Sequence, residues 1–262
     1  MMRVVARVLC VFLSSLFGSA VAFGQSSLLI WPIDPTIEYD QKGTALWLEN
    51  NGSAPIRVQA RVLAWHQEAG EEVYAEQESV IVSPPAAEIQ VGQRQLLRLV
   101  RIQAVAANTE HAYRVLIDEI PRPEFEAASG PPGIISPGSR IGLALQMRYS
   151  VPLFVSGEGV WTRQDYQKPR DMSKATQPQL TFRLESHQGD QWLVLVNDGP
   201  VHARLSSVFY RQGTRAVWEV PGLLGYVLAR SEARFRLPQR VSGGVLSAKM
   251  NASVDERVIP PR

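Results

Sequence analysis

The stretch "IGLALQMRYSVPLFV", residues 141–155, reads as a β-strand that follows a loop rich in Gly and Pro. Its apolar side chains recur at every second position and therefore share one face of the strand: Ile141, Leu143, Leu145, Met147 and Tyr149. A strand of this kind at the edge of a sheet is a template for aggregation. The alternation alone also fits an ordinary interior strand of a sandwich, because such alternation is common in antiparallel sheets.

Runs with the same alternation recur at intervals of about ten residues, which is typical of β-sandwiches. Turn-forming residues separate them, as in "NNGSAP" at residues 50–55 and "VNDGP" at residues 196–200. A polar, irregular segment at residues 156–178 divides the runs into two groups. The pattern predicts an all-β protein with two sandwich domains. The clearest runs cover residues 44–50, 56–66, 95–102, 112–120, 180–186, 191–198, 203–210, 225–230 and 233–237.

The first residues have the order of a secretory signal peptide. Arg3 and Arg7 precede an apolar run at residues 8–17, and small residues end at Ala22. We expect residues 1–25 to be removed on export, which places the mature chain in an oxidising compartment. The only cysteine, Cys10, lies within this leader, so the mature chain is expected to fold without a disulfide.

The charge and composition of the chain do not favour nucleic-acid binding or membrane insertion. Removing Arg3 and Arg7 lowers the Lys+Arg count from 27 to 25, equal to the 25 Asp+Glu, so the mature chain is close to neutral. Nothing in this balance indicates a nucleic-acid partner, and no later segment is long and apolar enough for membrane insertion.

No catalytic, metal or cofactor motif is present in the sequence. The four histidines, His66, His111, His187 and His202, have no ligand spacing, and no Gly-x-Ser-x-Gly elbow or phosphate loop occurs. Asp118 and Glu119 are adjacent and so fall on opposite faces of a strand. We therefore expect a protein that is not an enzyme, with no metal site and no cofactor.

The segment before the first-quoted strand, residues 121–139, is a long connection with five Pro and three Gly. Connections of this length in a compact domain are usually functional or mobile. A long loop followed by an apolar strand favours recognition of another chain by strand addition.

Several separated motifs now fall into a familiar order: "WLEN", "SPP", "GQRQLLRL", "YRVLIDEIP" and "LALQMRYSVPLF". In this order the sequence resembles the periplasmic chaperones of chaperone–usher pili, strongly over residues 28–155 and weakly beyond. Within that family, "LIWPIDPTIE" at residues 29–38 and "QMRYSVPLF" at residues 146–154 resemble the archaic, Csu-type branch.

The resemblance implies two immunoglobulin-like sandwiches in an L-shaped arrangement, with domains at residues 26–156 and 157–262. It also implies a periplasmic chaperone that binds pilus subunits lacking their final strand and delivers them to an outer-membrane usher. Residues 141–154 would be the donor strand, with Ile141, Leu143, Leu145, Met147 and Tyr149 entering the subunit groove. In the free protein, self-association or the preceding loop would cover this edge.

The resemblance further implies a basic anchor for the subunit's C-terminal carboxylate in the cleft between the domains. Better-known members place two basic residues on the first and last strands of the first domain, where this sequence has Asp34 and Ser150. Neither can bind a carboxylate in that way. Arg114 and Arg148, expected on adjacent strands, are therefore the candidate anchors, with Arg114 preferred.

The expected salt bridge between the two domains also departs from the family pattern. The family's interdomain salt bridge would join Glu119 to the position that Phe154 occupies, and Phe154 has no charge.

Trp31, Trp47 and Trp65 leave open a different class of protein, an exported adhesive or carbohydrate-binding module. We expect Trp47 and Trp65 to be core residues, because buried tryptophan is common in such sandwiches.

Overall fold

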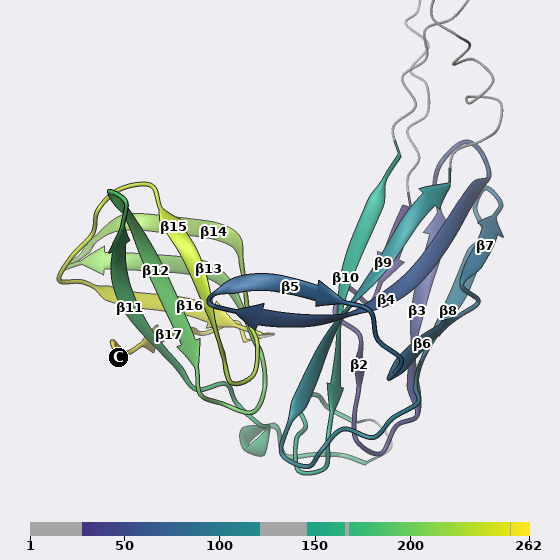
Figure 1. The fold of residues 1–262 in the computed structure, drawn as a ribbon, viewed down its shortest axis with the longest axis horizontal. Coiled ribbons are helices and arrows are strands. Elements are labelled where there is room, and N and C mark those ends of the chain that lie inside the picture. The colour runs from purple at the N-terminus through teal and green to yellow at the C-terminus, as the bar shows by residue number, and fades with distance from the viewer. Residues whose placement is uncertain (1–27, 121–145, 166–167, 252) are drawn as a thin grey trace, which may run out of the picture.

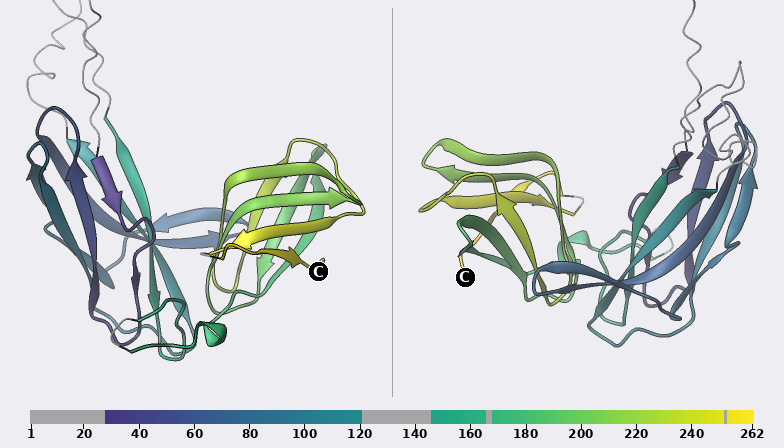
Figure 2. Two further views of the ribbon diagram at one scale, coloured as in Figure 1. Left: turned by 180° about the vertical axis from the view of Figure 1, so that it is seen from behind. Right: turned by 45° about the horizontal axis from the view of Figure 1, so that its top comes forward.

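The computed structural model describes residues 28–120, 146–165, 168–251 and 253–262, which form two β-sandwiches set at an angle (Figures 1 and 2). The expected all-β, two-domain immunoglobulin-like architecture is confirmed. Among these residues, no helix is long and apolar enough to cross a membrane.

The N-terminal sandwich contains two sheets, in the orders β1-β3-β8-β6 and β2-β10-β9-β4-β5, with β7 paired to β4. All pairs are antiparallel except β2 with β10, which is parallel. The strands are β1 (Leu28–Trp31), β2 (Thr36–Ile37), β3 (Gly43–Asn50), β4 (Ile56–Glu68), β5 (Glu71–Ala75), β6 (Val80–Ser83), β7 (Ala86–Ile89), β8 (Arg94–Arg101), β9 (Glu110–Ile120) and β10 (Arg148–Ser156).

Alternation in the sequence builds the core of this sandwich. On β9, Tyr113, Val115 and Ile117 are buried between the sheets, while Arg114 and Leu116 point to the opposite face. β4 and β10 follow the same rule, so the outer face of this sheet is the one that carries Arg114.

The C-terminal sandwich has sheets of order β11-β12-β15 and β14-β13-β16-β17. Its strands are β11 (Leu180–His187), β12 (Asp190–Asn197), β13 (Ala203–Gln212), β14 (Arg215–Val227), β15 (Ser231–Leu237), β16 (Val245–Met250) and β17 (Glu256–Ile259). The segment between the sandwiches contains no strand and one short 3₁₀ turn (Met172–Lys174) in its described part, in agreement with its polar, irregular sequence.

In each sandwich, a buried asparagine forms side-chain hydrogen bonds that stabilise a turn. Asn50 and Asn197 are fully buried, and each begins an Asn-x-Gly turn. The side-chain amide of Asn50 donates to the carbonyl oxygens of Ala54 and Ile89, and its Oδ1 accepts from the backbone of Gly52. Asn197 serves its own turn in the same way, so these turns owe their rigidity to internal hydrogen bonds.

An aromatic cluster joins the two sandwiches. Trp65 of β4 and Phe154 of β10 pack against Tyr226 and Leu228 of the C-terminal sandwich. The ring of His202 lies flat on Phe154, with ring centroids 3.4 Å apart. The side chain of Gln67 adds two hydrogen bonds, donating to the Tyr226 carbonyl and accepting from the Leu228 amide. The position of one sandwich relative to the other is therefore set by packing as well as by the connecting chain.

The polar contact between the domains differs from the one that the family pattern implies. Glu119 accepts a hydrogen bond from the Tyr149 hydroxyl inside the N-terminal sandwich, and Phe154 is part of the aromatic cluster. The interdomain carboxylate is Glu110 instead, whose Oε1 accepts from the backbone N–H of His202 and lies 2.8 Å from His202 Nδ1. This pair has no sequence signal, because its members are 92 positions apart.

The aromatic cluster predicts a large effect for Phe154→Ala. Phe154 is completely buried, so truncation removes its stacking and leaves a cavity between the sandwiches. We expect the free energy of unfolding to fall by about 3–5 kcal/mol in urea titrations. Leu223→Ala, at a half-exposed position, should change it by less than about 0.5 kcal/mol. Equal losses in the two variants would contradict the assigned role of the cluster.

An ionic cluster in the C-terminal sandwich predicts acid sensitivity. A hydrogen bond from Arg183, together with the charges of Arg183 and Arg234, holds the pKa of Glu185 below its ordinary value of 4.5. A carboxylate with a lowered folded-state pKa contributes stability that is present above the ordinary value and lost as the pH falls through the lowered one.

We therefore expect the free energy of unfolding to decrease as the pH falls through and below the ordinary glutamate pKa of 4.5. Glu185→Gln should flatten part of that decrease, and Glu76→Gln, at an exposed carboxylate, should not. Urea titrations across this range make the comparison, and an unchanged profile in Glu185→Gln would exclude Glu185 as a contributor.

Candidate functional site

The outer edge of β10 is only partly paired. On one side β10 pairs with β9 from Arg148 to Ser156. On the other side, among the described residues, β2 pairs only with Phe154 and Val155. The edge of residues 148–153, called here the open edge, therefore has no paired strand within the described part of the chain.

The hydrogen-bond pattern shows which backbone groups the open edge presents. The carbonyl of Met147 accepts from Glu119 of β9, whereas the amide of Phe154 donates away from β9 to Pro35. Because antiparallel pairing alternates along a strand, the backbone groups of Arg148 and Ser150 also point away from β9. Pro152 is the next outward residue and has no N–H, so the open edge loses a donor there.

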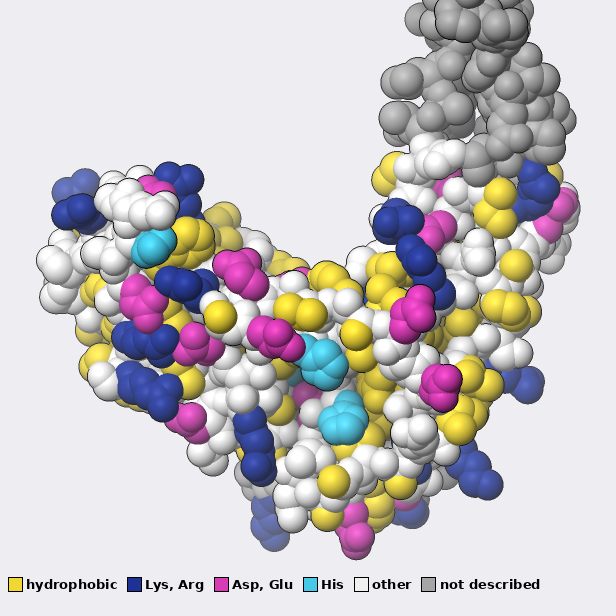
Figure 3. Space-filling view, in the orientation of Figure 1, with side chains coloured by type: hydrophobic (Ala, Val, Ile, Leu, Met, Phe, Trp, Pro, Cys, Tyr) yellow, Lys and Arg dark blue, Asp and Glu magenta, His cyan; other side chains and the backbone are white. Residues whose placement is uncertain are grey.

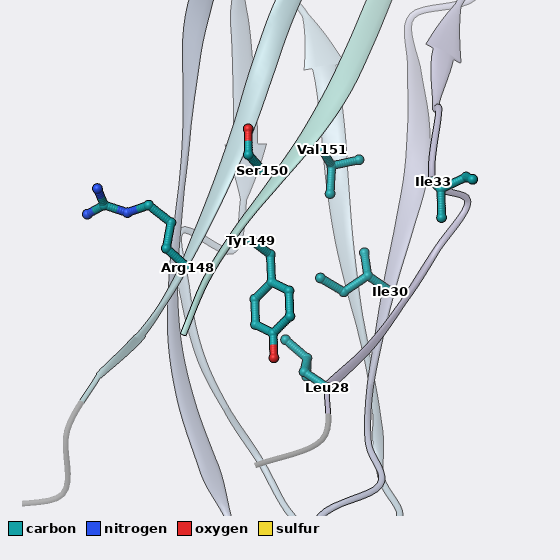
Figure 4. Close-up of a pocket in the computed structure, with 7 residues that line it drawn as sticks. All are labelled: Leu28, Ile30, Ile33, Arg148, Tyr149, Ser150 and Val151. Carbon is teal, nitrogen blue, oxygen red and sulfur yellow. The ribbon is translucent and has the colours of Figure 1, made fainter. Parts of the chain in front are cut away.

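Beside the open edge lies an apolar groove of about 400 Å³ between the two sheets (Figure 4). Tyr149 and Val151 from β10 form one wall, and Leu28, Ile30 and Ile33 form the other. Burial, with help from the Glu119 carboxylate, raises the pKa of Tyr149 to about 12, so its phenol is neutral and donates to Glu119. The site thus combines unpaired backbone with uncovered apolar surface.

The predicted donor residues divide between described and undescribed parts of the chain. Ile141, Leu143 and Leu145 lie outside the described residues. Met147 is 45% exposed, and Tyr149 lines the groove. By alternation these positions share a face with Val151 and Leu153, which are buried in the sandwich core.

Arg114 lies at the end of the site that faces the C-terminal sandwich. Its Cα partner on β10 is Pro152, and the open edge therefore runs directly toward it. The side chain is only 12% exposed, and its guanidinium carbon is 3.7 Å from the Trp65 ring centroid and 5.4 Å from that of Tyr226. Its buried Nε has no hydrogen-bond partner among the described residues. A cation held in this way is suited to an incoming carboxylate.

A carboxylate already stands near this guanidinium. Glu72 Oε1 is 3.7 Å from Arg114 Nη2, beyond hydrogen-bonding distance, and Glu72 Oε2 accepts from the Tyr74 hydroxyl. Partial burial and the Glu72 carboxylate together raise the pKa of Tyr74 to about 12, which keeps this hydroxyl a donor. Both residues come from β5, whose polar sequence "EEVYA" has no apolar alternation to draw attention to it.

Comparisons with known proteins agree with this geometry. Residues 36–160 match the family model for the pili and flagellar-assembly chaperone, PapD N-terminal domain. A structure of the CsuC–CsuE chaperone–tip adhesion subunit pre-assembly complex, from archaic chaperone–usher Csu pili of Acinetobacter baumannii, is similar over 89% of this chain and 97% of that chain. The sequence identity is 31% and the TM-score is 0.70. The chain belongs to the pilus-chaperone family.

More distant chaperones share the fold. The E. coli chaperone DraB is 17% identical, with a TM-score of 0.57 over 90% of this chain and 97% of that chain. The SafB chaperone in complex with Salmonella enterica SafA pilin is 19% identical, with a TM-score of 0.56 over 86% and 90%. A comparison with curated protein sequences finds no match. The predicted Csu-type branch is confirmed, and the family is periplasmic and non-enzymatic.

In this chaperone the second candidate anchor, Arg148, is poorly placed. Its side chain is 62% exposed and hydrogen-bonded to Asp118, which also lies 3.8 Å from Arg61. Its Cα partner on β9 is four residues from Arg114, about 14 Å along the strand. The two arginines therefore do not form a joint binding site, and Arg114 is the better candidate.

The positions that correspond to the family's usual basic pair have other roles here. Asp34 forms an ion pair with Arg163 of the interdomain segment, with 2.8 Å between Oδ2 and Nη2. Ser150 belongs to the open edge. No group of three or more His, Cys, Asp or Glu within the described part of the chaperone is arranged to hold a metal ion.

One tryptophan assignment was wrong. Trp65 is buried as expected, but Trp47 faces outward from β3 and is only partly buried. It stacks on Trp31 of β1 with ring centroids 6.3 Å apart, and the Arg94 guanidinium lies 5.3 Å from the Trp31 ring. Strand alternation explains the error, because Leu46 and Leu48 on either side of Trp47 take the inward positions.

The alternation of the open edge predicts a pattern of amide hydrogen exchange in the free chaperone. Tyr149 and Val151 donate toward β9 and should be protected, whereas the amides of Arg148 and Ser150 point outward and should exchange far faster. Phe154, bonded to Pro35, is the internal control for a protected outward amide. Nuclear magnetic resonance exchange on the monomer tests this, and equal protection at all four positions would show that the edge is covered.

Proposed function

We propose that this chaperone captures pilus subunits that lack their final strand by lending them its own strand at residues 141–154. The observation that carries this proposal is the open edge of β10, with an apolar groove beside it and Arg114 at its end. The CsuC–CsuE complex supports a subunit as the partner, since the related protein in it is a chaperone bound to a tip subunit.

The alternating apolar side chains would provide most of the binding free energy. Burying each of Ile141, Leu143, Leu145 and Met147 in a subunit groove is worth about 1.5–3 kcal/mol. An exposed ion pair contributes only about 0–1 kcal/mol. The strand would therefore set affinity, while backbone pairing along the open edge would satisfy polar groups in both chains.

The anchor would set the register. A strand that pairs with the open edge and continues past Pro152 reaches the cleft wall where the Arg114 guanidinium lies against Trp65. A guanidinium can donate two parallel hydrogen bonds to one carboxylate, which a one-residue slip would break. Arg114 is thus the proposed ligand for the subunit's C-terminal carboxylate.

The same proposal covers the export of the chaperone and the delivery of its subunit. The leader at residues 1–25 would direct export to the periplasm, leaving domains at residues 26–156 and 157–262. The loaded chaperone would then deliver its subunit to an outer-membrane usher. Without a subunit, the open edge would be covered by self-association or by the segment before it, because an exposed edge strand promotes aggregation.

The alternative of an adhesive or carbohydrate-binding module has one supporting feature, the outward Trp31–Trp47 pair. These rings stack on one another, and Arg94 covers part of Trp31, which leaves less free ring surface for a sugar. The open edge has no role in that alternative, so strand lending accounts for more of the structure.

The decisive experiment is periplasmic co-expression with a Csu-type subunit lacking its own donor peptide, followed by pull-down. The wild type should yield soluble complex, whereas Leu143→Ser/Leu145→Ser should yield almost none, because two buried leucines are lost. The matched control is Leu29→Ser/Ile81→Ser, two half-exposed apolar residues on the other sheet. Normal capture by the donor-strand variant, or glycan binding by the isolated chaperone without subunit rescue, would overturn the proposal.

A further inference from the structure

The β4–β5 hairpin links the cleft to both sandwiches. It extends from the N-terminal sandwich to the C-terminal one (Figures 1 and 2). Gln67 bonds to Tyr226 and Leu228, and the carbonyl of Gly70 accepts from the backbone N–H of Arg234 at 3.1 Å. The hairpin therefore belongs to the N-terminal sheet at its base and is bonded to the C-terminal sandwich at its tip. The residues that it carries are held in place by both sandwiches.

Glu72 is one of these residues, and its carboxylate has two different neighbours. Oε2 is engaged by the Tyr74 hydroxyl, while Oε1 faces Arg114 Nη2 at 3.7 Å. The Glu72 side chain is 42% exposed. Arg114, in contrast, is almost buried. Charged side chains of both signs line the hollow between the sandwiches (Figure 3).

The Glu72 carboxylate partly balances the charge of the nearly buried Arg114 guanidinium. A nearly buried guanidinium without any anion nearby would be costly, and Glu72 reduces that cost in the free chaperone. The contact is nevertheless loose. At 3.7 Å it lacks the short paired hydrogen bonds of a good Arg–carboxylate pair, and Arg114 Nε has no partner among the described residues. A second carboxylate with better geometry would form a stronger pair.

We infer that Glu72 is a specificity-determining residue of the anchor, a built-in carboxylate that competes with the subunit's C-terminal carboxylate for Arg114. This inference rests on the proposed role of Arg114. A free carboxylate without a strand gains only the ion pair and has to displace Glu72. A subunit also pairs its backbone with the open edge, which holds its carboxylate at the cleft at high effective concentration. Glu72 thereby keeps free anions from occupying Arg114, whereas a chain end that arrives on a matching strand still binds, because strand pairing adds to its affinity.

The test uses the mature chaperone and a fluorescent peptide with the sequence of the subunit's last strand, made with a free C-terminal carboxylate and with an amide. Glu72→Gln keeps the size of the side chain and removes its charge. We expect this variant to bind the carboxylate peptide at least about threefold more tightly and the amide peptide unchanged. Glu71→Gln, an exposed neighbour on the same strand, should change neither affinity.

Acetate, as a competitor, extends the comparison to a carboxylate without a strand. It should displace the carboxylate peptide more readily from Glu72→Gln than from the wild type. Glu72→Ala repeats the charge removal without an amide and should shift both measurements in the same direction. It also gives the answer if Glu72→Gln fails to fold.

The outcomes separate the two proposals. If the wild type binds both peptides equally and Arg114→Gln changes nothing, the anchor itself is misplaced. If the carboxylate preference depends on Arg114 but Glu72→Gln leaves it unchanged, Glu72 does not compete. If Glu72→Gln weakens carboxylate binding, Glu72 orients Arg114 instead, and the inference is equally overturned.

Discussion

The open edge of β10, which has no strand partner among the residues that the structure describes, is the constraint on which the rest of this structure depends. A sheet edge with free N–H and C=O groups is unstable toward association, and here it lies beside an uncovered apolar groove. β2 covers the last part of the strand, and Pro152 removes a donor just before it. What remains open is a short, directional edge that ends at the cleft. This edge is the part of the chaperone that we propose a subunit completes.

The junction between the sandwiches makes the edge useful, because it places a cation where the edge ends. Trp65 and Tyr226 come from different sandwiches, and the Arg114 guanidinium lies near both rings. The aromatic cluster, the Gln67 bridge and the Glu110–His202 pair all hold that arrangement. The position of the Arg114 guanidinium and the packing of the junction therefore depend on the same few side chains.

Charged residues at the junction occupy positions that differ from the usual family pattern. The usual basic positions are Asp34 and Ser150, and the structure offers a different cation on β9, protected by aromatic rings and faced by Glu72. The interdomain carboxylate has likewise moved, from the expected Glu119 to Glu110. The chain thus keeps the architecture of the family while its charged contacts lie on other residues.

The sequence by itself determined the strands whose side chains alternate, the two-sandwich class and the apolar face of residues 141–149, because these depend on a period of two along one chain. It also singled out Arg114 through family resemblance. Only the tertiary structure decided that Trp47 faces outward, that Arg148 is occupied by Asp118, and that Glu72 stands opposite Arg114. Those facts depend on register and on contacts between residues far apart in sequence, which the local pattern of side chains does not encode.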